Sequence, residues 1–198
     1  MKLPLFEFPS FVYQIEDWSF KKKGLLARIN KSEFVRSDLQ NFETDRSTNG
    51  KTYVRYLEEF LEPQLTEFCK EAKVSCSMTD AWCVKYQKGD YQTTHNHRGW
   101  GFSGLINVKF DPEVHEPATF VSPWQNPVSD TTSLASFPPI EGLLMIAPSW
   151  ARTVSSLDQS VFHLVVSSLE IQSCLQSKVV SSARAPPLLV SHILTLPS

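Results

Sequence analysis

Two histidines separated by one residue are the side chains best suited to chemistry in this sequence. His95 and His97 close the segment YQTTHNH, at the end of a predicted strand. Residues i and i+2 of a strand face the same side, so the two imidazoles can converge on one ion across only about 7 Å of backbone. Imidazole is a ligand for Fe, Zn, Cu and Ni alike, so the pair predicts a transition-metal site without naming the metal.

Short strands separated by turns are predicted on both sides of this histidine pair. The runs that fit strands are residues 81–87, 91–95, 104–110, 119–122, 143–147 and 161–169, with a turn at Gly89-Asp90 between the first two. Several short strands at turn-separated intervals are typical of a sandwich or barrel.

Helical patterns come earlier in the chain. Residues 53–72 carry apolar side chains at three- and four-residue steps, and residues 21–30 fit a short helix despite Gly24. Pro63 lies inside the longer pattern, where a proline is expected to kink the helix or split it in two. Helices followed by strands predict an α+β protein with a jelly-roll core and the N-terminal helices packed on one sheet.

Composition limits the classes of partner. The chain has 198 residues, of which 41% are hydrophobic and 20% charged, and its net charge is −2. These values predict a globular protein and give no general basic field for nucleic acid or an anionic membrane. Neither a signal peptide nor an apolar run near the roughly 20 residues of a membrane span is found, so we expect a cytoplasmic protein. Residues 1–171 are predicted to form one domain, and the Ser-rich segment 172–198 a loosely packed or disordered tail.

The four cysteines do not form a C-x-x-C motif, which argues against a zinc ribbon or a thioredoxin-type site. Cys69, Cys76 and Cys83 are evenly spaced and are expected on a helix, its exit and the next strand. We therefore predict that the equal spacing does not bring them together, and that all are reduced, mostly buried thiols.

Three motifs occur in order around the histidines and together resemble a known family. They are Y-x-K-G-D-Y-x-x-x-H-N-H-x-x-x-x-F-S-G at residues 86–104, the strand SGLIN at 103–107, and GLLMIAPS at 142–149. This arrangement is similar to phage and bacterial proteins, above all cyanophage-type members, of the Fe(II)/2-oxoglutarate oxygenase superfamily. The resemblance covers roughly residues 78–150.

The resemblance implies a double-stranded β-helix that binds Fe(II) and 2-oxoglutarate. Such an enzyme converts 2-oxoglutarate to succinate and CO₂ while hydroxylating a substrate, here unidentified. His95 and His97 would occupy the first two ligand positions. The remaining site residues that the resemblance implies are Trp82 and Tyr86 in the cofactor pocket, and Trp100, Phe102 and Ser103 near its mouth. The expected partner is the small-molecule cosubstrate, and the location a host cytoplasm if the gene is phage-borne.

The sequence departs from the family where the third metal ligand is expected. No histidine follows Pro148-Ser149, and the next one, His163, falls nearer the usual place of the arginine that anchors 2-oxoglutarate. Three interpretations stay open. In the first, His163 is the third ligand and Arg152 or a lysine anchors 2-oxoglutarate. In the second, the site is degenerate and the protein is a non-catalytic binding or accessory module. In the third, the reading frame shifts near residue 150. A cupin-like metalloenzyme that does not use 2-oxoglutarate is a further alternative.

Overall fold

Two antiparallel sheets and two helices make up the part of the chain that the structure describes. The structure is a computed structural model, and it describes residues 2–5, 8–36, 41–97, 101–111, 113, 115, 117–125, 132–138, 140–156 and 161–172. The elements in chain order are β1 (Lys2–Leu5), β2 (Phe8–Gln14), α1 (Trp18–Ile29), β3 (Val35–Arg36), β4 (Glu43–Thr44), α2 (Tyr53–Ala72), β5 (Ser75–Tyr86), β6 (Tyr91–His95), β7 (Phe102–Lys109), β8 (Thr119–Gln125), β9 (Thr132–Ser136), β10 (Leu143–Pro148), β11 (Arg152–Ser156) and β12 (Val161–Gln172).

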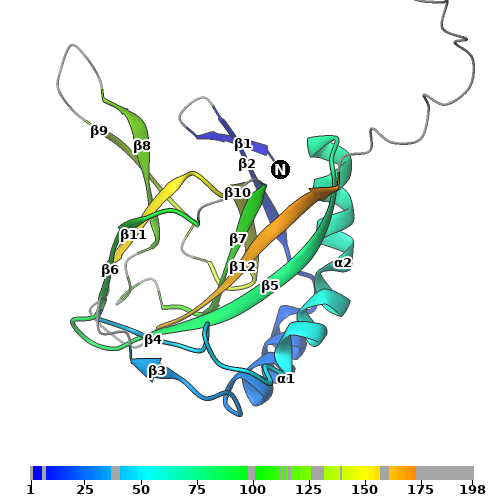
Figure 1. The fold of residues 1–198 in the computed structure, drawn as a ribbon, viewed down its shortest axis with the longest axis vertical. Coiled ribbons are helices and arrows are strands. Elements are labelled where there is room, and N and C mark those ends of the chain that lie inside the picture. The colour runs from blue at the N-terminus through cyan, green and yellow to red at the C-terminus, as the bar shows by residue number, and fades with distance from the viewer. Residues whose placement is uncertain are drawn as a thin grey trace, which may run out of the picture.

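The larger sheet has the strand order β1-β2-β10-β7-β12-β5-β4-β3, and the smaller one the order β6-β11-β8-β9. Neighbours in the sheets are often far apart in sequence, as where β12 lies between β5 and β7. The two helices cover the face of the large sheet that points away from the small sheet (Figure 1). The predicted α+β class is therefore confirmed, while the double-stranded β-helix stays a prediction.

An amphipathic helix, α2, supplies most of the packing on the outer face of the large sheet. Leu57, Leu61 and Phe68 are fully buried on it, and the ring of Phe68 meets that of Phe11 from β2 edge-on at 5.0 Å between centroids. Burying each such side chain contributes about 1.5–3 kcal/mol. The helix runs through Pro63 as one element, so of the two predicted effects the split is wrong, while a kink stays a prediction. A proline inside a helix destabilises it by about 3 kcal/mol. Burial of the apolar side chains on both sides of Pro63 stabilises the helix by more than this amount.

The two helices approach each other closely at Gly24 of α1. A Cβ atom at this position would lie 2.5 Å from the hydroxyl oxygen of Tyr56 in α2. The glycine that weakens the helical pattern of residues 21–30 thus has a packing role, which offsets its low helix propensity. The predicted helix is confirmed and begins earlier, at Trp18.

A buried carboxylate fixes the segment between β4 and α2 to the large sheet. Asp45 is fully buried and accepts hydrogen bonds from the Tyr53 hydroxyl at 2.5 Å and from the Cys83 backbone N–H at 2.8 Å. Burial is the main cause that raises the pKa of Asp45, and the hydrogen bonds oppose it. This anchor holds the neighbouring Arg46 beside the inner face of β5.

The structure brings two of the evenly spaced cysteines together, contrary to the prediction. Cys69 lies near the end of α2 and Cys76 near the start of β5, and their sulfur atoms are 3.0 Å apart. The reason is the tight turn between the two elements, where Lys73 adopts a left-handed conformation (φ 56°) and reverses the chain. Cys83, also on β5, is a separate buried thiol.

The prediction of strands is confirmed for the six runs named above, although the ends of five of them differ and β3, β4, β9 and β11 were not predicted. The strand β12 ends at Gln172, the first residue of the predicted tail 172–198, and residues 173–198 lie outside the described residues. None of the helices that the structure describes is both long enough and apolar enough to cross a membrane.

Candidate metal centre

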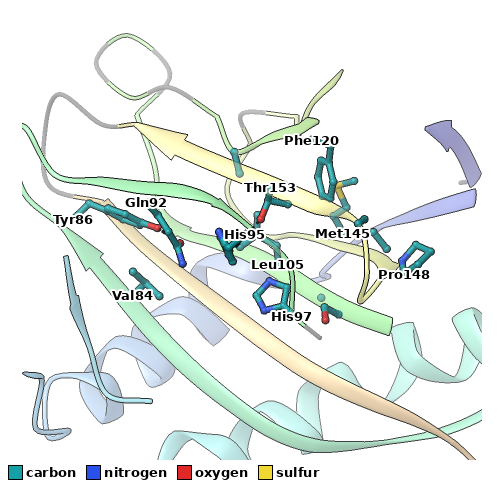
Figure 2. Close-up of a pocket in the computed structure, with 15 residues that line it drawn as sticks. Val84, Tyr86, Gln92, His95, His97, Leu105, Phe120, Met145, Pro148 and Thr153 are labelled. Carbon is teal, nitrogen blue, oxygen red and sulfur yellow. Dashed lines mark hydrogen bonds between the residues drawn. The ribbon is translucent and has the colours of Figure 1, made fainter. Parts of the chain in front are cut away.

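His95 and His97 line a cavity between the two sheets (Figure 2). The cavity measures about 560 Å³, counting the space at its open mouth. Its interior leaves only about 40 Å³ for the centres of water-sized molecules, so the cavity is narrow. Its apolar wall includes Val84, Leu105 and Ala118 together with Phe120, Met145 and Ala147, and its polar lining consists of Tyr86, Gln92, His95, His97, Ser103 and Thr153. An apolar cavity with a few convergent polar groups is the usual form of a binding site.

His95 is held at the end of β6 with one ring nitrogen directed to the backbone. Its Nδ1 atom lies 2.9 Å from the carbonyl oxygen of Thr93, which can only accept, so Nδ1 carries the proton. The lone pair is therefore on Nε2, 3.4 Å from the hydroxyl oxygen of Thr153. A metal-binding histidine commonly donates its other ring N–H to a carbonyl in this way.

His97 is fixed by the turn between β10 and β11. Its backbone N–H donates a hydrogen bond to the carbonyl oxygen of Ser149 at 2.9 Å. The backbone N–H of Ser149 in turn donates to the carbonyl oxygen of Gly101 at 3.0 Å. The Ser149 hydroxyl also meets that of Ser103 at 2.9 Å inside the protein. The Pro-Ser motif therefore positions the second histidine, although the two segments lie some fifty residues apart in sequence.

The two imidazole rings lie side by side, as the spacing predicts. Their centroids are 5.2 Å apart and their planes are inclined at 82°. Burial, followed by the proximity of His95 and Arg46, lowers the pKa of His97 to about 4. Burial also lowers the pKa of His95, and Arg46 adds to this, while the bond to Thr93 opposes it. Both rings are therefore neutral at pH 7, the form in which imidazole binds a metal.

No third ligand of the usual kind completes the pair among the residues whose side chains the structure describes. Within them, no group of three His, Cys, Asp or Glu side chains is placed to hold a metal ion. The polar group facing His95 from the next strand is instead Thr153, its directly paired partner in β11. His163 lies in β12, where its backbone is paired with Val84 on one side and Asn107 on the other.

The other predicted site residues fall in different surroundings. Tyr86 lines the cavity and donates a hydrogen bond to Gln92 at 2.7 Å, and Ser103 lines it as well. Trp82 does not line the cavity, but its ring centroid is 5.7 Å from that of His97. Phe102 packs on the opposite face of the sheet, against Phe68.

Two predicted residues lie elsewhere. Arg152 is exposed at the strand position between Ala151 and Thr153, both of which line the cavity, so it occupies the alternate face of β11. Trp100 lies outside the described residues.

Sequence reasoning missed three residues around the histidines: Thr153, Gln92 and Arg46. Arg46 lies with its guanidinium carbon 4.4 Å from the ring centroid of Trp82, and its charge acts on both histidines. Alternation along β6 places Gln92 on the face opposite His95, and only the irregular pairing of β6 with β11 brings both residues to the cavity, so the sequence pattern does not indicate Gln92. Thr153 depends on the register between β6 and β11, and Arg46 on the fold of a polar loop, so no sequence pattern indicates either of them.

Solved structures with a similar fold include a prolyl hydroxylase, a 2OG-Fe(II) oxygenase family oxidoreductase and an alpha-ketoglutarate-dependent epimerase. A prolyl-4-hydroxylase from Pseudomonas putida has a TM-score of 0.55 at 10% identity, over 79% of this chain and 89% of its own. A 2OG-Fe(II) oxygenase family oxidoreductase from Burkholderia pseudomallei has a TM-score of 0.60 at 10% identity, and the match covers 79% of this chain and 82% of that protein's chain. The epimerase SnoN from nogalamycin biosynthesis, in complex with Fe³⁺ and alpha-ketoglutarate, has a TM-score of 0.62 at 11% identity. The match covers 79% of this chain and 77% of the SnoN chain.

Similarity is confined to structure, since no protein-family model and no curated protein matches the sequence. At 10–11% identity the likeness concerns the arrangement of the chain and leaves the chemistry to the site residues. The chain shares the fold of the 2-oxoglutarate- and Fe(II)-dependent oxygenases.

Proposed function

We propose that this protein is an Fe(II)/2-oxoglutarate-dependent dioxygenase with a double-stranded β-helix core, of the cyanophage type that its motifs resemble. One observation carries the proposal: two neutral imidazoles, His95 and His97, lie side by side in a cavity between the sheets of an oxygenase-like fold. The reaction assigned to it is hydroxylation of a substrate with release of succinate and CO₂. The proposed setting is a cytoplasm, where Fe(II) stays reduced.

The donor chemistry of the site fits iron in part. Imidazole nitrogen is a ligand that Fe(II) accepts, and His95 is already in the tautomer that leaves Nε2 free to bind. We assign the third donor to His163. Its position in β12 is directly opposite Val84 of β5, and Val84 lines the cavity. Directly opposed residues of antiparallel strands share one face of a sheet, so position 163 belongs to the face that bounds the cavity.

The chain's own polar groups suit a small dicarboxylate. The Tyr86 hydroxyl and the Gln92 amide form a hydrogen-bonded pair at one end of the cavity, and either can donate to a carboxylate. Leu105, Phe120 and Met145 form an apolar wall that excludes water from the other side (Figure 2). Bound Fe(II) with 2-oxoglutarate would supply the oxidation of a C–H bond by O₂.

A cation lies beside the site, away from this polar end. Arg46 stacks on Trp82, which precedes Tyr86 by four residues along β5, or about 13 Å of extended strand. In this proposal Tyr86 and Gln92 hold the cosubstrate and Arg46 lies on the side from which the substrate approaches. The exposed Arg152 has no part in it.

A second candidate is a non-catalytic binding module with the same fold. The observation that favours it is the contact of Thr153 with His95, because this hydroxyl already engages the Nε2 lone pair that would bind a metal. Two imidazoles alone hold Fe(II) poorly.

Succinate formation separates the two candidates. Full-length protein is incubated with Fe(II), ascorbate, 2-oxoglutarate and O₂, and succinate is measured with and without each component. We expect slow, metal-dependent succinate formation even without substrate, lost in H97A and H163A and retained in N96A, which changes an exposed neighbour. Wild-type protein that forms no succinate would favour the binding module. Activity that survives in H163A would remove His163 from the proposal.

A further inference from the structure

A pair of thiols lies at the junction of α2 and β5, on the opposite side of the large sheet from the cavity. The sulfur atoms of Cys69 and Cys76 are 3.0 Å apart. The turn that joins them is tightened by a hydrogen bond from the Val74 N–H to the Cys69 carbonyl oxygen at 3.0 Å and by the left-handed Lys73. The positions of both cysteines are thus set by regular backbone structure.

Both thiols can be reached from solvent. Cys69 and Cys76 are half-buried and line a shallow surface groove together with Leu65, Thr66, Ser77 and Met78 and the carboxylates of Glu58 and Glu62. Cys83 provides an internal comparison, because it is fully buried and burial raises its pKa well above the ordinary value. A small oxidant would therefore meet the first two thiols and leave the third unreacted.

We propose that Cys69 and Cys76 are a redox modification site that forms a reversible intramolecular disulfide. A disulfide needs sulfur atoms about 2.05 Å apart, so the two sulfur atoms have to move about 1 Å closer. This proposal does not depend on the proposed oxygenase activity.

The oxidant we assign is a peroxide. One thiolate attacks a peroxide oxygen, forming a sulfenic acid and releasing the other oxygen as water after protonation. The second thiolate then attacks that sulfur, forming the S–S bond and displacing the hydroxyl group as a second water. Two thiols and H₂O₂ thus give one disulfide and two waters, and the two electrons come from the sulfurs. A dithiol reductant reverses the modification by exchange.

Burial, with Cys69 as the next cause, raises the pKa of Cys76 to about 12. Cys76 therefore stays a thiol at neutral pH, and we expect the disulfide to form faster as the pH rises from 7 to 9.

The test is peptide mapping of oxidised, full-length protein. Reduced protein is treated with H₂O₂, remaining thiols are alkylated, and the protein is digested for mass spectrometry. We expect a mass lower by about 2 Da, a cross-link between the peptides that contain Cys69 and Cys76, and complete reversal by dithiothreitol. C83S should form the same cross-link, whereas C69S and C76S should not.

Thermal unfolding gives a second measurement on wild-type protein, independent of the variants. Closing this short loop restricts the unfolded chain, so the oxidised form should melt about 5 °C above the reduced form. Free alkylation of both cysteines after peroxide treatment, or a disulfide to Cys174 or to a second chain, would overturn the proposal.

Discussion

The Nε2 atom of His95 lies 3.4 Å from the hydroxyl oxygen of Thr153, across a directly paired position of β6 and β11. Since Nδ1 of the same ring donates to the Thr93 carbonyl, the threonine hydroxyl donates to the lone pair that would bind a metal. A metal at this site must replace that hydrogen bond. The relationship makes position 153 the most informative one for testing how the site is completed.

A histidine at position 153 should replace a missing third ligand. We expect H163A to lose Fe(II) or Co(II) binding and T153H/H163A to regain at least about tenfold in affinity, because a third imidazole completes the donor set. Calorimetric titration with Co(II) measures this. The matched control is R152H/H163A, whose new imidazole lies on the alternate, exposed face of β11. Equal affinity of the two double variants would contradict the geometry.

Removing the charge of Arg46 should raise the pKa of both histidines in metal-free protein. Its positive charge is one of the causes that lower these pKa values, although burial is the larger cause for each. NMR titration of the imidazole resonances in R46Q measures the change. R55Q removes an exposed arginine of α2 that pairs with Glu59, and should leave both pKa values as in the wild type. Unchanged titration in R46Q would separate Arg46 from the site.

The Tyr86 hydroxyl should matter for cosubstrate binding. In Y86F we expect the KM for 2-oxoglutarate to rise about tenfold with little change in kcat, since a hydrogen bond to a carboxylate is worth about 1.5 kcal/mol. Steady-state succinate assays give both constants. Y91F changes a half-exposed tyrosine of β6, the next strand along the chain, and should behave as the wild type. A fall in kcat at constant KM would show that Tyr86 has another role.

The buried Asp45 should make stability depend on pH in a direction unusual for a carboxylate. Its folded-state pKa is raised, mainly by burial, so its contribution to stability is fully present below the unfolded pKa and is lost as pH rises through the folded one. The free energy of unfolding of the wild type, relative to D45N, should therefore be greater at pH 4 than at pH 7.

Urea denaturation at both pH values measures this difference, and E59Q, which alters an exposed carboxylate of α2, is the control. A difference between wild type and D45N that grows towards pH 7 would show that hydrogen bonds from Tyr53 and Cys83 outweigh burial.

Local patterns predicted the elements whose signals lie within one segment. The strand Tyr91–His95 was predicted to the residue, because turn residues bound it, and α2 was predicted because its apolar period extends over five turns. The strands β3 and β4 have two residues each, too few for a period, and the five residues of β9, TSLAS, do not alternate between polar and apolar. β11 is interrupted by a bulge in its pairing with β6 that the sequence does not mark.

The candidate site shows the same limit. The spacing of His95 and His97 predicted their shared cavity, although β6 ends at His95 and a hydrogen bond to Ser149 positions His97. The facing Thr153, the cation at Arg46 and the Cys69–Cys76 contact arise from pairings and turns between separate segments. Their identity depends on register and packing, which the residue types alone do not encode.

The most direct test of the central claim is an anaerobic titration of wild-type protein with Fe(II), followed by 2-oxoglutarate and visible absorption spectroscopy. We predict one tightly bound Fe(II) per chain, and a new charge-transfer absorption when 2-oxoglutarate is added, both missing in H95A/H97A. Wild-type protein that binds Fe(II) no more tightly than H95A/H97A, and shows no new absorption, would contradict the account.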